Sequence, residues 1–245
     1  MKTYGLIGYP LQHSFSEGYF NEKFRSENID AQYINFEIPT IDELKRIIAS
    51  VSLSGLNVTL PYKEQVIPYL DELDAEAAAI GSVNVIKFTQ KKSKPWLIGY
   101  NSDATGFTQS IEPLLQPHHR EALVLGTGGS AKAIAYGLKS LGIRAVFVSR
   151  TPRKGQLAYT HLTPAVMETF TVIVNCTPVG MFPHVDTCPD IPYELLTERH
   201  LLYDLLYNPN ETLFMQRGAA QGATVKNGLE MLLLQGFTAW EIWNK

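Results

Sequence analysis

Long apolar runs are missing from this sequence, and their absence excludes a membrane-spanning helix. The longest ones, such as Met231–Leu234, are far shorter than the ~20 residues that a bilayer requires. The residues before Pro10 contain no extended apolar segment, so they do not resemble a secretory signal peptide. We therefore expect a cytoplasmic protein with no membrane partner.

Cysteine and net charge are also scarce. Cys176 and Cys188 are the only cysteines, and without a secretory signal we expect both to be reduced thiols. The formal net charge of −3 gives no reason to expect nucleic acid or an acidic membrane surface as a partner. Histidines that could bind metal are isolated or, at His118-His119, lie in a polar loop flanked by proline, so we expect no metal site.

Strand-like and helix-like segments alternate along the chain, which is typical of an α/β protein with parallel sheets. In the first half, short apolar runs predict strands at Tyr4–Gly8, Gln32–Ile38, Gly55–Leu60 and Val83–Phe88. Apolar residues at helical spacing, or an Ala- and Glu-rich composition, predict helices at Glu17–Asn28, Ile41–Ser50 and Asp71–Ile80. The lysine-rich segment Gln90–Pro95 is typical of a solvated hairpin tip.

A second α/β series begins near Asp103. Its expected strands are Glu121–Leu125, Ala145–Ser149, Val172–Asn175, Leu201–Asp204 and Ala223–Val225, with a helix at Ser130–Leu141. The tail Gly228–Trp243 has a helical period and is too apolar to lie on a surface, so we expect it to pack back across both halves. These patterns predict two domains, residues 1–102 completed by 228–245, and residues 103–227.

A glycine-rich segment, Gly126-Thr127-Gly128-Gly129-Ser130-Ala131, follows one predicted strand and opens a predicted helix. In that context, glycines allow a tight turn and a close approach to a pyrophosphate, whose charge is met by N–H groups at the helix start. The segment therefore predicts a dinucleotide site. The alternative is a plain strand-to-helix turn.

The next predicted strand indicates which dinucleotide binds. It ends Val148-Ser149-Arg150-Thr151, where a site for NAD usually has a carboxylate that binds the ribose hydroxyl. The planar guanidinium of Arg150 suits a 2′-phosphate instead. Arg153 and Lys154 follow, and they fit a solvated loop equally well. The missing acid also argues against an S-adenosylmethionine enzyme, so NADP is the predicted cofactor.

The first half of the chain carries polar residues at turns after strands. Gly8-Tyr-Pro-Leu-Gln-His-Ser14-Phe-Ser16 resembles the opening signature of shikimate dehydrogenases, and Asn57-Val-Thr59-Leu-Pro-Tyr-Lys63 is similar to the family's next motif. Further segments resemble the remaining motifs in the right order, at residues 81–84, 99–106, 175–181, 204–209 and 228–235. The resemblance therefore spans nearly the whole chain.

The resemblance implies an N-terminal α/β substrate domain, a Rossmann-like NADP domain, and reduction of 3-dehydroshikimate to shikimate in chorismate and aromatic amino-acid biosynthesis. It implies that Lys63 and Asp103 form the catalytic pair. It places Ser14, Ser16 and Tyr207 at the substrate carboxylate, and Thr59, Asn84 and Gln235 at the ring hydroxyls. The implied cofactor residues are Gly126, Thr127, Gly128, Gly129, Ser130 and Ala131 at the pyrophosphate, Ser149, Arg150 and Thr151 at the 2′-phosphate, and Asn175, Thr177, Met181 and Gly228.

The residue types suit this chemistry independently. Reduction of a ketone leaves a developing alkoxide, and a lysine ammonium can supply both positive charge and a proton. Asp103 would orient Lys63, and it could also cap the helix that follows it.

Single residues, such as Glu17, Ser82 and Val85, depart from the family's pattern, but the more important departure is the segment after Arg150. Pro152 and Pro164 interrupt Thr151–Phe170, where the family usually has a full helical crossover, so the adenosine-side contacts stay open. Two alternatives remain: a quinate or dual quinate/shikimate dehydrogenase, against which Arg150 argues, and a noncatalytic NADP-binding relative, which would be free to lose Lys63 or Asp103. The oligomeric state stays open between a monomer and a homodimer.

Overall fold

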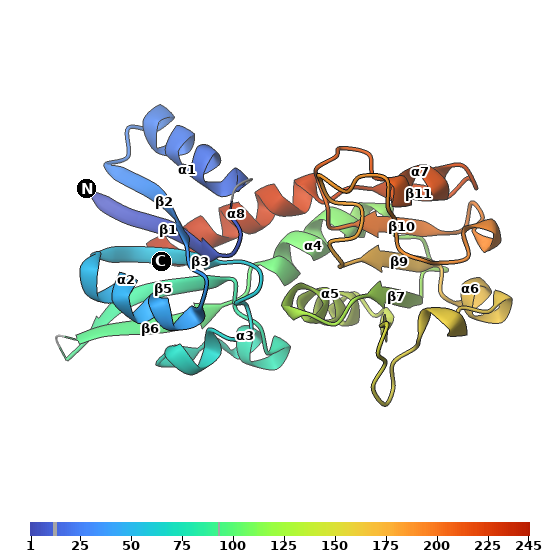
Figure 1. The fold of residues 1–245 in the computed structure, drawn as a ribbon, viewed down its shortest axis with the longest axis horizontal. Coiled ribbons are helices and arrows are strands. Elements are labelled where there is room, and N and C mark those ends of the chain that lie inside the picture. Colours follow the sequence, from blue (N-terminus) through green and yellow to red (C-terminus); the bar gives the residue numbers. More distant parts are fainter. Residues whose placement is uncertain (12–13, 93) are drawn as a thin grey trace. The chain divides into compact units, whose positions relative to one another are not determined.

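The computed structural model describes residues 1–11, 14–92 and 94–245. These residues group into two compact units, residues 1–102 with 236–245, and residues 103–235. Each unit is built on its own β-sheet (Figure 1). None of the described helices is both long and apolar enough to cross a membrane.

The first unit contains a six-stranded mixed sheet. Its strands, in spatial order, are β2 (Ala31–Glu37), β1 (Lys2–Gly8), β3 (Leu53–Val58), β5 (Val85–Lys91), β6 (Lys94–Tyr100) and β4 (Glu72–Leu73). β1 runs parallel to β2 and β3, whereas β5 runs antiparallel to β3 and β6. The antiparallel pair β5 and β6 forms the hairpin expected around Gln90–Pro95, because a connection as short as this one can join only antiparallel strands. The parallel pairing expected from the alternating pattern holds for β1, β2 and β3, and for β4 with β6, but not for β5.

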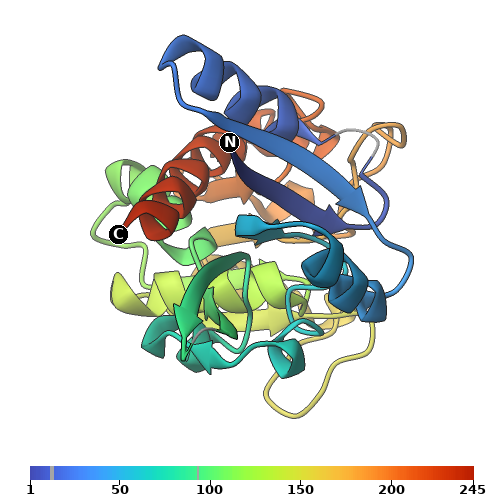
Figure 2. The same ribbon diagram turned by 90° about the vertical axis from the view of Figure 1, so that its left-hand side faces the viewer.

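Helices cover both faces of this sheet. Helix α1 (Phe15–Ser26) and the end of α8 (Leu229–Asn244) lie near β1 (Figure 2). Their buried side chains pack in a cluster with Tyr4 and Leu6 of that strand. Ile7 points to the other face, as the alternation of side chains along a strand requires. There it packs with α2 (Leu44–Ser50) and α3 (Ala75–Ile80). Two short 3-10 helices, η1 (Ile41–Glu43) and η2 (Ile67–Tyr69), complete this layer.

The segment Asp71–Ile80 differs from the single helix expected there. It forms β4 first, and α3 begins only at Ala75. A carboxylate oxygen of Asp71 accepts a hydrogen bond from Leu97 N at 2.8 Å, so the chain is held along β6. Asp74 then caps α3 by accepting from Glu76 N at 3.0 Å. Aspartate side chains offer the backbone such alternatives to helix, and here they override the Ala-rich composition.

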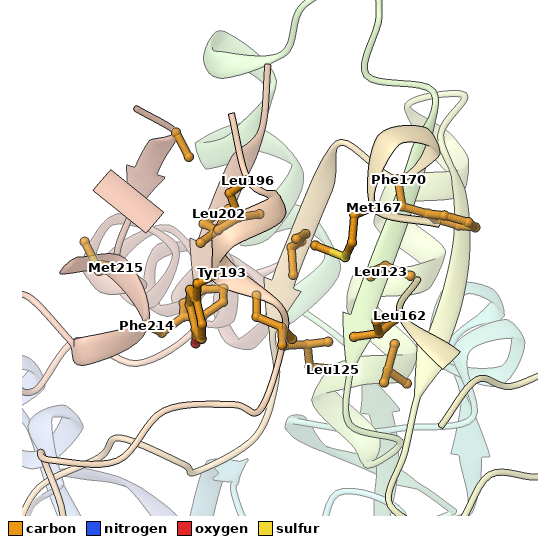
Figure 3. Packing of buried hydrophobic residues seen from close by; sticks show 14 residues of the cluster. Leu123, Leu125, Leu162, Met167, Phe170, Tyr193, Leu196, Leu202, Phe214 and Met215 are labelled. Carbon is orange, nitrogen blue, oxygen red and sulfur yellow. The ribbon is translucent and has the colours of Figure 1, made fainter. Parts of the chain in front are cut away.

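The second unit contains a five-stranded sheet in which every pair of neighbouring strands is parallel. Its strands, in spatial order, are β11 (Thr224–Lys226), β10 (Leu201–Asp204), β9 (Val172–Asn175), β7 (Glu121–Leu125) and β8 (Arg144–Val148). Helices α4 (Asp103–Ile111) and α5 (Gly129–Ser140) pack on one face. Helices α6 (Pro164–Thr169) and α7 (Leu213–Ala219) contribute to the core on the other (Figure 3). Three 3-10 helices lie in its loops, at η3 (Glu112–Leu114), η4 (Tyr159–His161) and η5 (Tyr193–Leu195).

The crossover from β8 to β9 is short, as the two prolines predict. Only η4 and α6 occur between these strands, and Pro164 stands at the first position of α6. Leu157 forms a single isolated bridge with Val148, where a further parallel strand would begin. β8 therefore ends the sheet.

Helix α8 contributes to the cores of both units, as expected from its apolar tail. Ala239 and Trp243 pack in the first unit, and Met231 packs in the second. The boundary between these units lies further along the chain than the expected one, because residues 228–235 group with the second unit instead of completing the first. The cause is close packing on α4: a Cβ on Gly106 would lie 2.8 Å from Met231 O and 2.9 Å from Gln235 N.

Candidate active site

In the first unit, the residues that sequence analysis singles out lie at one end of the sheet's strands. β1, β3 and β6 have their carboxyl ends there, and the antiparallel β5 begins there. Ser14 and Ser16 follow β1 at the start of α1, Thr59 and Lys63 follow β3, and Asn84 precedes β5. Gln12 and His13, which belong to the same motif, lie outside the described residues.

The loops after β1 and β3 are joined at Thr59. Thr59 N donates to Ile7 O at 2.9 Å, and Tyr9 N donates to Leu60 O at 3.0 Å. Gly8 allows this approach, because a Cβ there would overlap the methyl group of Thr59. Lys63 is half-buried, and its carbonyl accepts from Val83 N at 2.8 Å. The lysine backbone is therefore fixed to the segment that leads into β5.

Asn84 is buried and its amide has a fixed orientation. Its Oδ1 accepts from Ser102 N at 2.7 Å, and its Nδ2 donates to Ser102 Oγ at 2.9 Å. Asp103 follows directly, and it is only 4% exposed. It is the first residue of α4 and does not stand in the position before the helix that a cap would occupy.

The two serines of the opening motif differ in their surroundings. Ser14 precedes α1, yet its side chain does not cap the helix, and its buried Oγ has no hydrogen-bond partner among the described residues. Ser16 is hydrogen-bonded to the side chain of Tyr33, whose hydroxyl donates to Asn57 Oδ1 at 2.7 Å. Burial raises the pKa of Tyr33 well above its ordinary value. A buried polar atom without a protein partner, placed at a helix N-terminus, suits an anionic ligand.

In the second unit, the glycine-rich turn follows β7, the strand from which the chain builds the sheet first to one side, with β8, and then to the other, with β9. β7 lies between β9 and β8, and open α/β sheets bind ligands at the carboxyl ends of strands beside such a switch point. Gly126 has φ +108°, a value that favours glycine, and a Cβ there would lie 3.3 Å from Thr177 Cγ2. A Cβ on Gly128 would meet nothing within 4 Å, so the turn is open in front of α5.

The other predicted cofactor residues of the turn after β7, and those of the loop after β8, also lie at the carboxyl ends of these strands. Thr127 is exposed, Ser130 lies in the first turn of α5, and Gly129 and Ala131 are buried against the sheet. After β8, Ser149 Oγ accepts from Thr151 N at 3.2 Å. Arg150, Thr151, Arg153 and Lys154 are all exposed.

The loop after β9 is fixed by Asn175, which is fully buried. Asn175 Oδ1 accepts from Thr177 N at 3.0 Å and from Thr177 Oγ1 at 2.6 Å. Its Nδ2 donates to Asp204 Oδ1 at 3.0 Å. Burial raises the pKa of Asp204 to about 6, against the opposing effect of its hydrogen bonds from Thr212, Leu206 and Asn175. Asp204 was not predicted as a site residue, and the only signal was its place at a strand end within a family-like motif.

The other predicted residues lie on neighbouring loops and on α8. Met181 is 44% exposed, and Tyr207 is half-buried, which raises the pKa of its hydroxyl. Gly228 packs so closely against Leu205 that a Cβ would overlap its carbonyl group. Gln235 lies on α8, where its Nε2 donates to Leu232 O at 3.1 Å.

The neighbouring histidines His118 and His119 both bond to the main chain. His118 and His119 both bond to Arg199 O through Nε2, at 2.9 and 3.1 Å, as expected for structural histidines. Within the described ranges, no three histidine, cysteine, aspartate or glutamate side chains gather as a metal site would require. Cys176 and Cys188 are free thiols.

Taken as a class, this arrangement is that of a two-domain, dinucleotide-dependent α/β dehydrogenase. A parallel sheet carries a glycine turn at its switch point and an arginine after the next strand, and a separate α/β unit carries the polar residues.

Comparison with known proteins identifies the family. Residues 6–86 match the model of the shikimate dehydrogenase substrate binding domain. Shikimate dehydrogenase (NADP(+)) of Desulforamulus reducens is 36% identical over 262 residues, covering 98% of this chain and 88% of the relative. The structure of shikimate dehydrogenase from Aquifex aeolicus is 33% identical with a TM-score of 0.87, covering 100% of this chain and 92% of that one. The Thermus thermophilus enzyme in complex with NADP(H) and shikimate is 30% identical with a TM-score of 0.84, covering 99% and 93%. The chain belongs to the shikimate dehydrogenase family, and the expected fold class is confirmed.

Proposed function

We propose that this protein reduces the ring ketone of 3-dehydroshikimate to the alcohol of shikimate with NADPH, reversibly, as a step of the shikimate pathway. The observation that carries the proposal is the extent of the similarity. It covers 98% of the chain, and the sequence retains Lys63 and Asp103, the pair that a noncatalytic relative would be free to lose.

The residues of the first unit suit a polyol acid as substrate. We propose that Ser14 and Ser16, together with Tyr207, bind the carboxylate, and that Thr59, Asn84 and Gln235 bind the ring hydroxyls. The buried Oγ of Ser14 at the start of α1, which has no hydrogen-bond partner in the described part of the chain, supports the carboxylate assignment. The fixed amide of Asn84 supports the second assignment, because directional hydrogen bonds need donors and acceptors whose orientation is set beforehand.

The second unit fits NADP. The open turn from Gly126 to Ala131 would hold the pyrophosphate, and the exposed guanidinium of Arg150 would pair with the 2′-phosphate. Ser149 and Thr151 lie beside it, whereas Asn175, Thr177, Met181 and Gly228 would line the nicotinamide side. When bound, the reduced cofactor supplies the hydride that the carbonyl carbon accepts.

We propose that Lys63 supplies the proton. As the ketone is reduced, negative charge develops on its oxygen, and an ammonium group can stabilise that charge and then transfer a proton to it. In the reverse direction the neutral amine accepts the proton from the alcohol. Asp103 would orient Lys63 and stabilise its charged form.

The decisive experiment follows absorbance of the reduced nicotinamide while the purified protein acts on 3-dehydroshikimate. We expect oxidation of NADPH to outpace that of NADH at equal concentrations. Oxidation of quinate with NAD⁺ as the faster reaction would instead support the quinate alternative. No activity with any combination of these substrates and cofactors would indicate a noncatalytic relative. The cytoplasmic location, the absence of nucleic acid as a partner, and the state of monomer or homodimer stay predictions.

A further inference from the structure

Three loops of the second unit, which follow β9, β10 and β11, are tied together at the carboxyl ends of those strands. Phe182 N donates to Asn208 O at 3.2 Å, and Gly228 N donates to Leu206 O at 2.9 Å. Under the proposed function, these loops carry Asn175, Thr177, Met181, Tyr207 and Gly228. How the loops are held relative to one another therefore decides how these residues meet their ligands.

The carboxylate of Asp204 joins two of these loops through its side chain. Its Oδ1 accepts from Asn175 Nδ2 at 3.0 Å and from Leu206 N at 3.1 Å, and its Oδ2 accepts from Thr212 Oγ1 at 2.6 Å. The first bond reaches Asn175, the last residue of β9, from which the next loop begins. The second closes the turn that leads to Tyr207, and the third reaches the residue that caps α7.

This carboxylate also settles the orientation of the Asn175 amide. An ionised carboxylate can only accept hydrogen bonds, so Asn175 must turn its NH₂ group toward Asp204. Its oxygen then faces Thr177, where it accepts from both the backbone N and the side-chain Oγ1. With the amide reversed, two oxygens would face each other at Asp204, and the backbone N–H of Thr177 would lie against the NH₂ group.

The sheet itself does not require an acid at this position. β10 pairs with β9 through the main chain, and its other side chains, Leu201, Leu202 and Tyr203, are buried apolar or aromatic groups. Burying a carboxylate is unfavourable, as the raised pKa of Asp204 shows. The hydrogen bonds that this carboxylate accepts hold the neighbouring loops and are not part of the sheet.

We propose that Asp204 is a positioning residue for the reaction, because it orients Asn175, and through it Thr177, and holds the loop after β9 against the turn that carries Tyr207. The inference rests on the proposed function, which gives these loops their ligands. Asp204 itself contacts neither substrate nor cofactor in this assignment.

The test compares Asp204→Ala with Asp204→Asn in steady-state kinetics with NADPH and 3-dehydroshikimate. The alanine variant leaves the Asn175 amide without its acceptor, and misplaced groups of this kind lower kcat/KM by about 10- to 100-fold. The asparagine variant can keep its amide oxygen toward Asn175 and Leu206, with its NH₂ toward Thr212, so its kcat/KM should stay within about threefold of the unaltered protein, well inside the cost of one lost buried hydrogen bond.

Thr212→Val is the matched control. It removes the bond to Oδ2 and the cap of α7, but it leaves both bonds to Oδ1 in place. We expect its melting temperature to fall while both KM values and kcat stay unchanged. If kcat/KM falls in Thr212→Val as far as in Asp204→Ala, the carboxylate serves only the fold, and the proposal is overturned. Unchanged kinetics in Asp204→Ala overturn it as well.

Asp204→Ser provides a second variant if the alanine protein does not fold. Its hydroxyl is too short to replace Oδ1, so it should show the same loss of kcat/KM, and wild-type kinetics in it would overturn the proposal. Equilibrium titration with NADP⁺ separates this inference from the proposed function. An unaltered protein that turns over no substrate contradicts the function, whereas weaker NADP⁺ binding by the alanine or serine variant than by Thr212→Val would still support the role of Asp204.

Discussion

Gly8 and Thr59 lie so close together that a methyl group does not fit between them. A Cβ on Gly8 would overlap Thr59 Cγ2 and would lie 2.8 Å from Leu11 Cδ2. The glycine thus lets the loop after β3 lie directly against the end of β1, with Thr59 N bonded to Ile7 O. Thr59 is one of the proposed substrate residues. The absence of a side chain at Gly8 therefore helps to set the position of a residue of the proposed site.

Gly8→Ala should therefore affect substrate binding more than cofactor binding. The added methyl group must displace Thr59, and overpacking of this kind costs about 1–3 kcal/mol of stability. We expect the KM for 3-dehydroshikimate to rise while the KM for NADPH stays constant. Gly18→Ala is the control, because a Cβ there meets nothing within 4 Å and alanine favours the interior of α1. A normal KM for 3-dehydroshikimate in Gly8→Ala would separate Thr59 from the site.

Lys63→Ala should lose turnover and keep shikimate binding. Its backbone bond to Val83 N does not involve the side chain, so the loop should hold its place. Loss of a general acid costs about 10²- to 10⁴-fold in kcat. Calorimetric titration with shikimate checks the binding, and Lys45→Ala, at an exposed lysine of α2, is the control.

Asp103→Asn should also lower kcat. The double variant should lose less activation free energy than the sum of the two single losses. A rise in KM alone would make Lys63 a binding residue.

Asp204 should make stability depend on pH between about 4 and 6. Because burial raises its pKa in the folded protein to about 6, from an ordinary value of 3.8, the folded state holds a proton that the unfolded state has already lost in this range. The contribution of Asp204 to stability is therefore greatest below pH 4 and is lost as pH rises to 6. Relative to Asp204→Asn, the unaltered protein should lose up to about 3 kcal/mol of unfolding free energy between pH 4 and pH 7. Urea denaturation across this range measures it, and a difference that does not vary with pH contradicts the prediction.

Local sequence patterns predict the second unit most closely. Strands β7, β9 and β10 have the predicted bounds, because buried parallel strands are short apolar runs that end at turn residues. β6 was not predicted as a strand, since it opens Lys94-Pro95 and keeps part of its surface exposed. The segment 71–80 was predicted as one helix, because its Ala-rich composition says nothing of the bonds that Asp71 makes to β6.

The site residues divide in the same way. The turn at Gly126 could be predicted because its geometry depends on neighbouring residues of the chain: a positive φ, an open approach and a helix start. The part played by Asp204 depends on Asn175, 29 positions away, and arises only when β9 and β10 pair. No local pattern carries that information. The burial of the Ser14 hydroxyl, without a hydrogen-bond partner among the residues that the structure describes, also depends on packing that the sequence does not express.

Arg150→Ala should narrow the preference for NADPH over NADH. Arg150 follows β8 in an exposed position, beside a turn in which Ser149 Oγ accepts from Thr151 N, and a guanidinium there can pair with a 2′-phosphate through two donors. A charge-assisted contact of this kind contributes about one to two powers of ten in affinity. The variant should thus bind NADPH about 10- to 100-fold more weakly, while NADH binding and kcat stay the same.

Arg153→Ala is the matched control for Arg150→Ala, because Arg153 is another exposed arginine of the same loop. Its contribution to NADPH binding should be smaller and should disappear at high salt. Fluorescence titration of both cofactors against the three proteins makes the comparison. Equal affinity of the unaltered protein for NADPH and NADH would contradict the role of Arg150 and would favour the quinate alternative.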